Sequence, residues 1–120
     1  MNNAVGLFLT LHGVAHLVGF LIPWKLLVAE DLPFSTRLYF GKIEAGERGV
    51  RMLGLIWLAL AVGFVLSGIA LMGYDYSHLP SLVLLSIISL FLSILGLPFS
   101  PIGIFVNAVI LLSVAIKLLA

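Results

Sequence analysis

The sequence predicts an all-α fold, an integral membrane bundle of four transmembrane helices. Of the 120 residues, 62% are hydrophobic and 9% are charged, whereas a soluble domain carries about 25% charged residues. The apolar residues gather in four runs, each close to the roughly 20 residues that cross a bilayer core as a helix. The runs cover residues 4–22, 50–73, 79–97 and 102–119. With their connections they fill residues 1–120, which indicates a single domain.

The first run, residues 4–22, is expected to be a retained helix rather than a signal peptide. It has no basic residues before its apolar stretch, the stretch is too long, and no small-x-small cleavage site follows it. Helices are favoured over strands in all the runs, because membrane strands alternate apolar and polar residues. A helix also satisfies its own backbone polar groups, as lipid requires.

Three connections separate the runs. The first, residues 23–49, is the longest and begins with Pro23 and Trp24, a helix breaker beside an interfacial aromatic residue. The second carries Tyr74 and Tyr76 as aromatic anchors. The third is a short turn with two prolines, so the last two helices should be antiparallel neighbours.

Basic residues gather on the side of the first connection, and Lys117 is the exception. By the positive-inside rule, we expect the first connection in the cytoplasm of a bacterium and both termini on the periplasmic side of the inner membrane. The basic residues of the first connection and its boundary are Lys25, Arg37, Lys42, Arg48 and Arg51.

Composition excludes several classes of function. The chain has no cysteine, which excludes disulfides and thiolate-based metal sites. Its net charge is +1 and it has no basic run, so no nucleic-acid partner is expected. No nucleophile with its base, phosphate-binding loop or nucleotide fingerprint is recognisable, which argues against an enzyme.

Polar residues from different runs fall at one depth of the expected membrane. At about 1.5 Å per residue, His16 lies roughly 9 Å below the boundary at the first connection, and His12 lies about 6 Å deeper. Buried polar groups in lipid normally face the bundle interior. We therefore expect a polar cavity in the cytoplasmic half, open toward the first connection. The other residues of this layer are Trp57, Ser89, Ser93 and Asn107.

His12 and His16 are one helical turn apart, so both side chains can point into the bundle. The pair offers two ligands to a transition metal such as Zn, Cu, Fe or Ni, or a site for a proton or small ligand. A haem would need one of them and a ligand from another helix. The alternative is a pair of neutral histidines that hydrogen-bond across helices to Asn107, Ser89 or Ser93.

The segment "GKIEAGERGVR" places acids four residues before arginines, as Glu44–Arg48 and Glu47–Arg51. Such pairs would form a salt-bridged start of the second helix. Alternatively, Glu47 is a third ligand or proton carrier beside the histidines. Arg51 would then clamp an anionic headgroup or carboxylate.

Small residues at intervals of three or four form stripes on three of the runs, and such faces let helices approach closely. They predict close packing within the chain or between two copies in a homodimer. The stripes are Ala15 with Gly19; Ala59, Gly63 and Ser67; and Ser86, Ser89, Ser93 and Gly96.

Two stretches resemble the signature of a group of small, uncharacterised bacterial four-helix membrane proteins: "HGVAHLVGFLIPW", residues 12–24, and "GVRMLGLIWL", residues 49–58. More loosely, the layout with a histidine in the first helix is similar to the DoxX-like group. The resemblance implies no activity. It implies that His12, His16, Arg51 and Trp57 matter together.

Three functions follow as hypotheses. The first is a membrane protein that binds or carries a small ligand, proton or cation through the two histidines. The second is an accessory subunit of a larger membrane complex, with the histidines as interhelical hydrogen-bonding residues. The third is a membrane enzyme that acts on a lipid or quinone near Arg51. The candidate ligand-binding residues are His12, His16, Glu47, Arg51, Trp57, Ser89, Ser93 and Asn107, and the histidines are also the candidate metal ligands.

Overall fold

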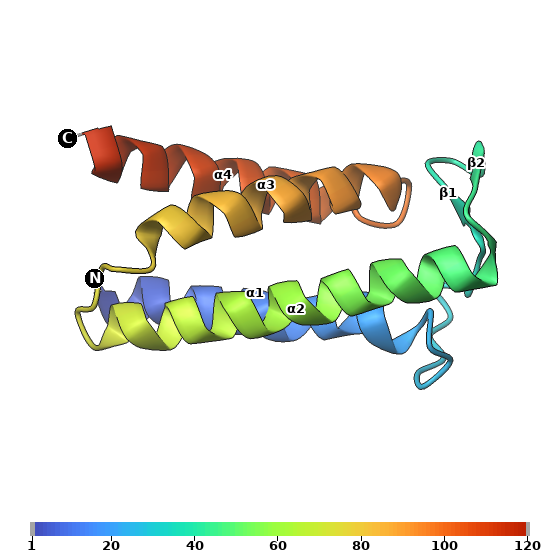
Figure 1. Cartoon of the computed structure of the whole chain (residues 1–120), viewed down its shortest axis with the longest axis horizontal. Helices are drawn as coiled ribbons and strands as arrows, with labels where there is room; N and C mark the ends of the chain where they lie inside the picture. The colour runs from blue at the N-terminus through green and yellow to red at the C-terminus, as the bar shows by residue number, and fades with distance from the viewer. Residues whose placement is uncertain (1, 120) are drawn as a thin grey trace.

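A computed structural model describes residues 2–119 and has an all-α architecture with one small β-hairpin (Figure 1). The all-α prediction is confirmed. The helices are α1 (Asn2–Leu21), α2 (Gly46–Met72), α3 (Leu79–Leu95) and α4 (Pro101–Leu119), and the strands are β1 (Arg37–Leu38) and β2 (Ile43–Glu44).

Three of the helices, α1, α2 and α4, are long and apolar enough to cross a membrane. The helix α3 is apolar too, but its 17 residues span about 26 Å at 1.5 Å per residue, slightly less than a hydrocarbon core of about 30 Å. The sequence placed the end of this run at residue 97, whereas the helix ends at Leu95. The reason is Pro98, which disfavours a helical conformation for the residue before it.

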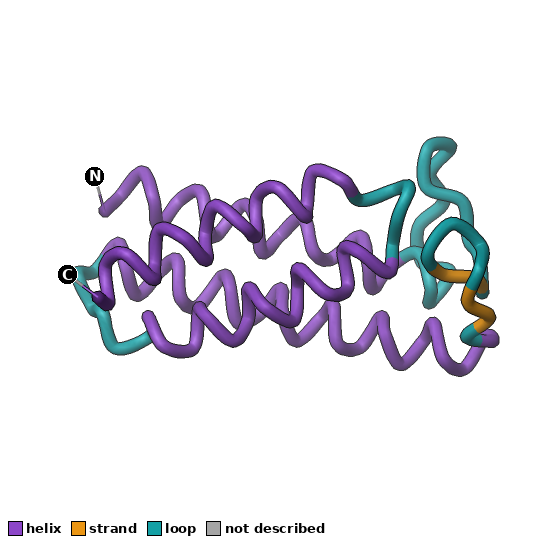
Figure 2. Tube along the Cα trace, turned by 90° about the horizontal axis from the view of Figure 1, so that it is seen from above, coloured by secondary structure: helices purple, strands orange, loops and turns teal. Residues whose placement is uncertain are grey.

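The helices form two antiparallel hairpins that lie side by side (Figures 1 and 2). In the first, α1 packs against α2, and in the second, α3 packs against α4. The two hairpins meet most closely through α2 and α3. Both described ends of the chain lie at one end of the bundle, and the β-hairpin lies at the other together with the α3–α4 turn (Figure 1).

The contact between α1 and α2 is made by small residues. A Cβ on Gly6 would lie 2.6 Å from the backbone oxygen of Gly68, and a Cβ on Gly68 would lie 2.6 Å from the backbone oxygen of Gly6. Farther along, a Cβ on Gly13 would lie 2.8 Å from the backbone oxygen of Ala61. The two backbones therefore approach as closely as small-residue helix faces allow.

These contacts only partly match the stripes expected from the sequence. Gly63 faces α3, where a Cβ would lie 2.8 Å from the side chain of Leu85, and Ala59 is exposed. The positions of α2 that face α1 are instead seven residues apart in the chain, at Gly54, Ala61 and Gly68. A seven-residue repeat keeps one face toward an antiparallel neighbour over several turns.

The first connection folds back onto the bundle. Its strands pair antiparallel, and the turn between them docks on the end of α3. There the N–H of Tyr39 donates to the carbonyl of Leu95 at 2.6 Å, and the N–H of Phe40 donates to the carbonyl of Leu97 at 2.8 Å. The hairpin thus satisfies the carbonyl of Leu95, which the end of α3 leaves without a helical partner, and that of Leu97 in the following turn. The sequence pattern did not predict this hairpin.

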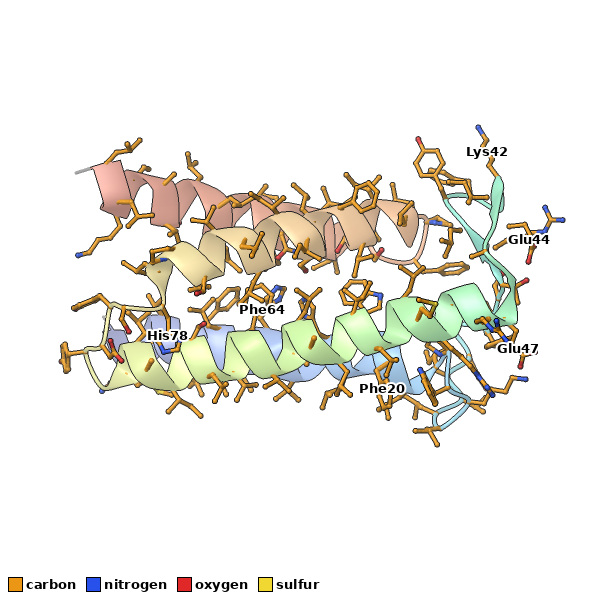
Figure 3. All side chains as sticks on the ribbon, in the orientation of Figure 1. Phe20, Lys42, Glu44, Glu47, Phe64 and His78 are labelled. Atoms are coloured by element: carbon orange, nitrogen blue, oxygen red, sulfur yellow. The ribbon has the colours of Figure 1, made fainter. Side chains whose placement is uncertain are left out.

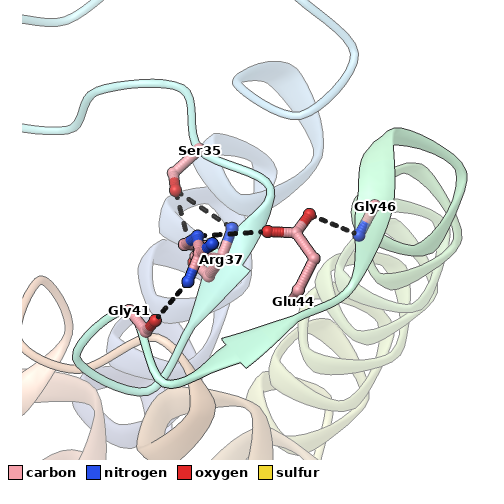
Figure 4. Close-up of polar contacts among 5 residues, drawn as sticks. All are labelled: Ser35, Arg37, Gly41, Glu44 and Gly46. Carbon is pink, nitrogen blue, oxygen red and sulfur yellow. Dashed lines mark hydrogen bonds and ion pairs between the residues drawn. The ribbon is translucent and has the colours of Figure 1, made fainter.

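The start of α2 also differs from expectation. The helix begins at Gly46, not near residue 50, and Glu44 lies before it in β2. The expected helical pair Glu44–Arg48 is therefore wrong, because Glu44 is not on the helix. Its carboxylate instead lies 3.3 Å from Nε of Arg37 across the hairpin (Figure 4).

Candidate functional site

A hydrogen-bonded network at the centre of the bundle joins α1 to α3 and α4. Nε2 of His16 lies 2.6 Å from Oγ of Ser89, and Nε2 of His12 lies 3.3 Å from Oδ1 of Asn107. The amide nitrogen of Asn107 donates to the same Ser89 hydroxyl at 2.8 Å. His16, Ser89 and Asn107 are buried. The structure therefore brings together four of the residues that the sequence singled out.

When both imidazole rings are neutral, the partners of this network set the direction of every bond. Nδ1 of His16 lies 2.7 Å from the carbonyl of His12, which can only accept, so Nδ1 carries the proton and Nε2 accepts from Ser89. Nδ2 of Asn107 donates to the carbonyl of Gly103 at 2.7 Å, which leaves Oδ1 to accept from Nε2 of His12. Every hydrogen bond of this network can thus be made between neutral groups.

One ring nitrogen remains outside the network. Because Nε2 of His12 donates to Asn107, Nδ1 of the neutral ring carries a lone pair. No residue in the described range 2–119 donates a hydrogen bond to this atom. His12 therefore offers one unused hydrogen-bond acceptor.

Aromatic side chains hold the two histidine rings in place. The ring of Phe64, fully buried, lies 4.9 Å from the His12 ring and 5.1 Å from the His16 ring, between the two helical hairpins (Figure 3). Trp57 lies edge-on to His16 at 5.0 Å. Gly19 makes room for it, since a Cβ there would lie 2.5 Å from Cγ of the indole.

A cavity of about 440 Å³ lies against the histidines. It is bounded by α1, α4 and the end of α3, and Trp57 and Ser93 also line it. The sequence predicted a polar cavity, but most of this wall is apolar. The reason is that Ser89 and Asn107 are fully buried behind the histidine rings, where their polar groups bond to one another.

A second cavity of about 650 Å³ lies beneath the β-hairpin. Its wall includes Arg37, Leu38 and Phe40. The two cavities are adjacent, one beside the histidines and one beneath the β-hairpin. The residues common to both walls are Ile22, Pro23, Pro33, Trp57, Gly96 and Phe99.

The charged residues expected at the site lie away from it. The carboxylate of Glu47 pairs with Nζ of Lys25 at 2.8 Å on the exposed surface, at the end of the bundle that carries the β-hairpin (Figure 3). The guanidinium of Arg51 lies over the ring of Trp24 at 5.4 Å, and the Trp24 indole N–H donates to the Arg51 carbonyl at 2.9 Å. Neither Glu47 nor Arg51 lines either cavity. The geometry therefore gives no support to Glu47 as a third ligand or to Arg51 as a clamp beside the histidines.

The exposed β-hairpin has its own polar contacts (Figure 4). A hydrogen bond from the hydroxyl of Thr36 lowers the pKa of Glu44 from its ordinary value, and the backbone N–H of Gly46 and the charge of Arg37 lower it further. Arg37 also donates to the carbonyl of Gly41 at 3.2 Å. These contacts order the connection above the second cavity.

The histidine geometry bears on the metal hypothesis. Both nitrogens of His16 and Nε2 of His12 are engaged in hydrogen bonds, so a cation held by both rings would have to break them. Within the described residues, no three His, Cys, Asp or Glu side chains gather where they could hold a metal ion. His78 lies at the opposite end of the bundle from Glu47 (Figure 3). A bound metal stays a prediction.

Two residues of the site were missed by the sequence reasoning. Gly103 accepts a hydrogen bond from Asn107 and leaves room for Ser93, since a Cβ on Gly103 would lie 2.6 Å from the Ser93 hydroxyl. Its position four residues before Asn107 is a signal that could have found it. Phe64 had no such signal, because it is one of many apolar residues in its run.

Comparison of the chain with known protein families, with curated proteins and with solved structures finds no match in any of the three. The resemblance to small four-helix membrane proteins therefore stays a prediction. Function is inferred from the geometry of the network and the cavities.

Proposed function

We propose that this chain is an integral membrane protein whose four helices cross the bilayer and whose cavity beside His12 and His16 binds a small, largely apolar ligand. The observation that carries the proposal is the cavity of about 440 Å³ against the two histidines. Small-molecule sites are typically concave and mostly apolar, with a few polar groups that orient the ligand, and measure about 300–1,000 Å³.

The outer surface of the bundle supports the membrane part of the proposal. On α4, Ile102 is 75% exposed, Phe105 70% and Leu112 64%. Soluble monomers rarely expose contiguous apolar surface on this scale, whereas hydrocarbon would cover it without cost. The three long apolar helices have the length that a bilayer core requires.

The orientation can be tested directly, because the chain has no cysteine. We propose that the β-hairpin end lies in the bacterial cytoplasm, on the basis of its basic residues. Ser35→Cys and Ser77→Cys would place one thiol at each end, since both serines are exposed. In intact cells, a membrane-impermeant maleimide should label the cysteine at position 77 and should reach position 35 only after lysis. Labelling of both from outside would contradict four spans.

The charges around the cavity favour a neutral ligand. No Asp, Glu, Lys or Arg lines the cavity beside the histidines, and Arg37 is the charged residue that lines the second one. A cation in lipid needs a charged or strongly polar partner. The geometry thus supports a neutral ligand better than a metal ion.

The binding proposal is tested by filling the cavity. Ala15 lines the cavity from α1, whereas Ala108 is exposed on α4 and does not line it, so Ala15→Phe and Ala108→Phe are matched variants. Mass spectrometry of organic extracts would compare both variants with the wild-type protein, each purified in mild detergent. A small apolar molecule should be enriched in the wild type and in Ala108→Phe and lost from Ala15→Phe. Identical extracts from all three proteins would refute binding in this cavity.

A second function, an accessory subunit of a larger membrane complex or a homo-oligomer, is favoured by one observation. The histidine network is satisfied by neutral partners within the chain, as expected of interhelical hydrogen bonds that stabilise a bundle. Identical extracts, together with co-migration of the wild-type chain with a larger assembly, would support this function over ligand binding.

A further inference from the structure

We infer that the ligand of this cavity is a neutral, membrane-dissolved molecule with an apolar body and a hydroxyl group, and that its O–H donates to Nδ1 of His12. The inference rests on the proposed function and specifies the chemistry of its ligand. Three features of the site lead to it: one free acceptor, a wall without charge, and an opening to the side of the bundle.

The free acceptor sets the polarity of the ligand's head group. Both nitrogens of His16 are bonded within the network, and Ser100 already donates its hydroxyl proton to the carbonyl of Ser93 at 2.6 Å. Nδ1 of His12 carries a lone pair and no proton, so it can only accept. A ligand that bonds there must therefore bring a donor. At this atom, a ligand's carbonyl or ether oxygen would place its own lone pair against that of the ring.

The uncharged wall selects among donors. An ammonium group would also donate to Nδ1, but it would enter a cavity whose lining holds no carboxylate. Moving a charge into such surroundings without a partner is strongly unfavourable. A hydroxyl group is a neutral donor and fits both requirements.

The position of the opening sets the route of the ligand. The cavity is lined from α1 and α4, and each of these helices packs mainly against a different partner, α2 or α3. On the α4 side, Ile102 is 75% exposed and Phe99 in the preceding turn is 51% exposed. The groove therefore opens sideways, toward lipid in the proposed orientation. His12 lies roughly 14 Å from the end of α1 at Leu21, so the ligand's hydroxyl would be held within the hydrocarbon layer.

The test compares 1-decanol with decyl methyl ether, its O-methylated form, which keeps the decyl chain and the oxygen but has no hydrogen-bond donor. The full chain, labelled with ¹⁵N-histidine, would be placed in lipid nanodiscs and titrated with each probe at equal mole fraction in the bilayer. The alcohol should shift the Nδ1 resonance of His12 and leave that of His78 unchanged. The ether should bind about tenfold more weakly, a difference of about 1.4 kcal/mol for one lost hydrogen bond. In His12→Phe the two probes should bind equally.

The comparison in the wild-type chain does not depend on any variant folding. Equal affinities for the alcohol and the ether would overturn the inference, yet would leave ligand binding in the cavity intact. Binding of neither probe, with a molecule still enriched over Ala15→Phe by extraction, would also overturn it and point to a different ligand. Binding of neither probe and no enriched molecule would overturn both this inference and the proposed function.

Discussion

The helix α1 makes two different kinds of contact on its two sides. Toward α2 it packs backbone against backbone at Gly6 and Gly13, and among the described residues no side-chain hydrogen bond joins the two helices. Toward α3 and α4 it is linked by hydrogen bonds from His16 to Ser89 and from His12 to Asn107.

The difference shows that close packing stabilises one helix contact of an apolar bundle and hydrogen bonds stabilise the other. Lipid gives helices no hydrophobic reason to associate, so close packing and hydrogen bonds must hold them together. At Gly6, Gly13 and Gly68 the α1–α2 contact depends on the absence of side chains and leaves no space. The contact with α3 and α4 depends on side chains that reach across a gap, and the rest of that gap is the cavity.

The largest effect is expected from breaking the contact that depends on shape. In Gly68→Ala the new Cβ would lie 2.6 Å from the carbonyl of Gly6 and 2.8 Å from the backbone nitrogen of Thr10, so the helices must separate. We expect a loss of about 3 kcal/mol, the upper part of the range for overpacking. The measurement is thermal unfolding in detergent, followed by circular dichroism.

Gly73→Ala is the matched control for this variant. Gly73 follows the same helix, its φ is −88°, and a Cβ there would lie 3.5 Å from the nearest atom, the carbonyl of Ala70. The variant should unfold within a few degrees of the wild type. Equal destabilisation by Gly68→Ala and Gly73→Ala would show that the α1–α2 contact is not limited by space.

The next largest effect is expected from the polar contact. Asn107→Leu removes the partner of His12 Nε2 and one of the two partners of the Ser89 hydroxyl, which keeps its bond to His16. We expect a cost of about 2 kcal/mol, since interhelical hydrogen bonds in membranes contribute about 0.6–1.7 kcal/mol each. The free energy of unfolding would be measured in the same detergent.

A double-mutant cycle sharpens this prediction. His12→Phe alone removes one bond, and combined with Asn107→Leu it replaces a polar pair by an apolar one. Removing both partners of a hydrogen bond often costs less stability than removing one partner and leaving the other buried without a bond. The double variant should therefore lose less stability than the sum of the single variants. Simple additivity would mean that the two side chains do not interact.

The hydrogen bonds from α1 to α3 and α4 could be predicted from the sequence more readily than the close packing of α1 on α2. Helical rise placed His12, His16, Ser89 and Asn107 in one layer, because depth in a straight helix follows from residue number. Polar groups in an apolar bundle then have few partners other than each other. Their bonds across helices were among the predicted alternatives, and the structure has them.

Other features could not be predicted because they depend on how the chain turns. The partners of Glu44 and Glu47 are Arg37 and Lys25, two residues of the first connection, and spacing along a helix does not show the path of that connection. The expected pair Glu44–Arg48 used spacing alone and ignored where α2 begins. Likewise, a stripe at intervals of four does not show which neighbouring helix it faces, and Gly63 faces α3.

The smallest change in stability is expected from a comparison of two buried serines, one with hydrogen-bond partners and one without. Ser86 and Ser89 lie one turn apart on α3 and both are fully buried. The Ser89 hydroxyl bonds to His16 and Asn107, whereas the Ser86 hydroxyl has no partner among residues 2–119. Ser89→Ala should cost about 1–2 kcal/mol through the loss of these two bonds.

Ser86→Ala should change stability by less than about 0.5 kcal/mol, because it removes a buried hydroxyl that gains nothing from the fold. The pair is measured side by side, since both variants lose the same atom from the same helix. Equal costs for Ser86→Ala and Ser89→Ala would mean that serine on α3 acts only through its small size, as the glycines of α1 do. A difference of about 1 kcal/mol or more would assign the stability of this interface to the bonds that the histidines and Asn107 make with Ser89.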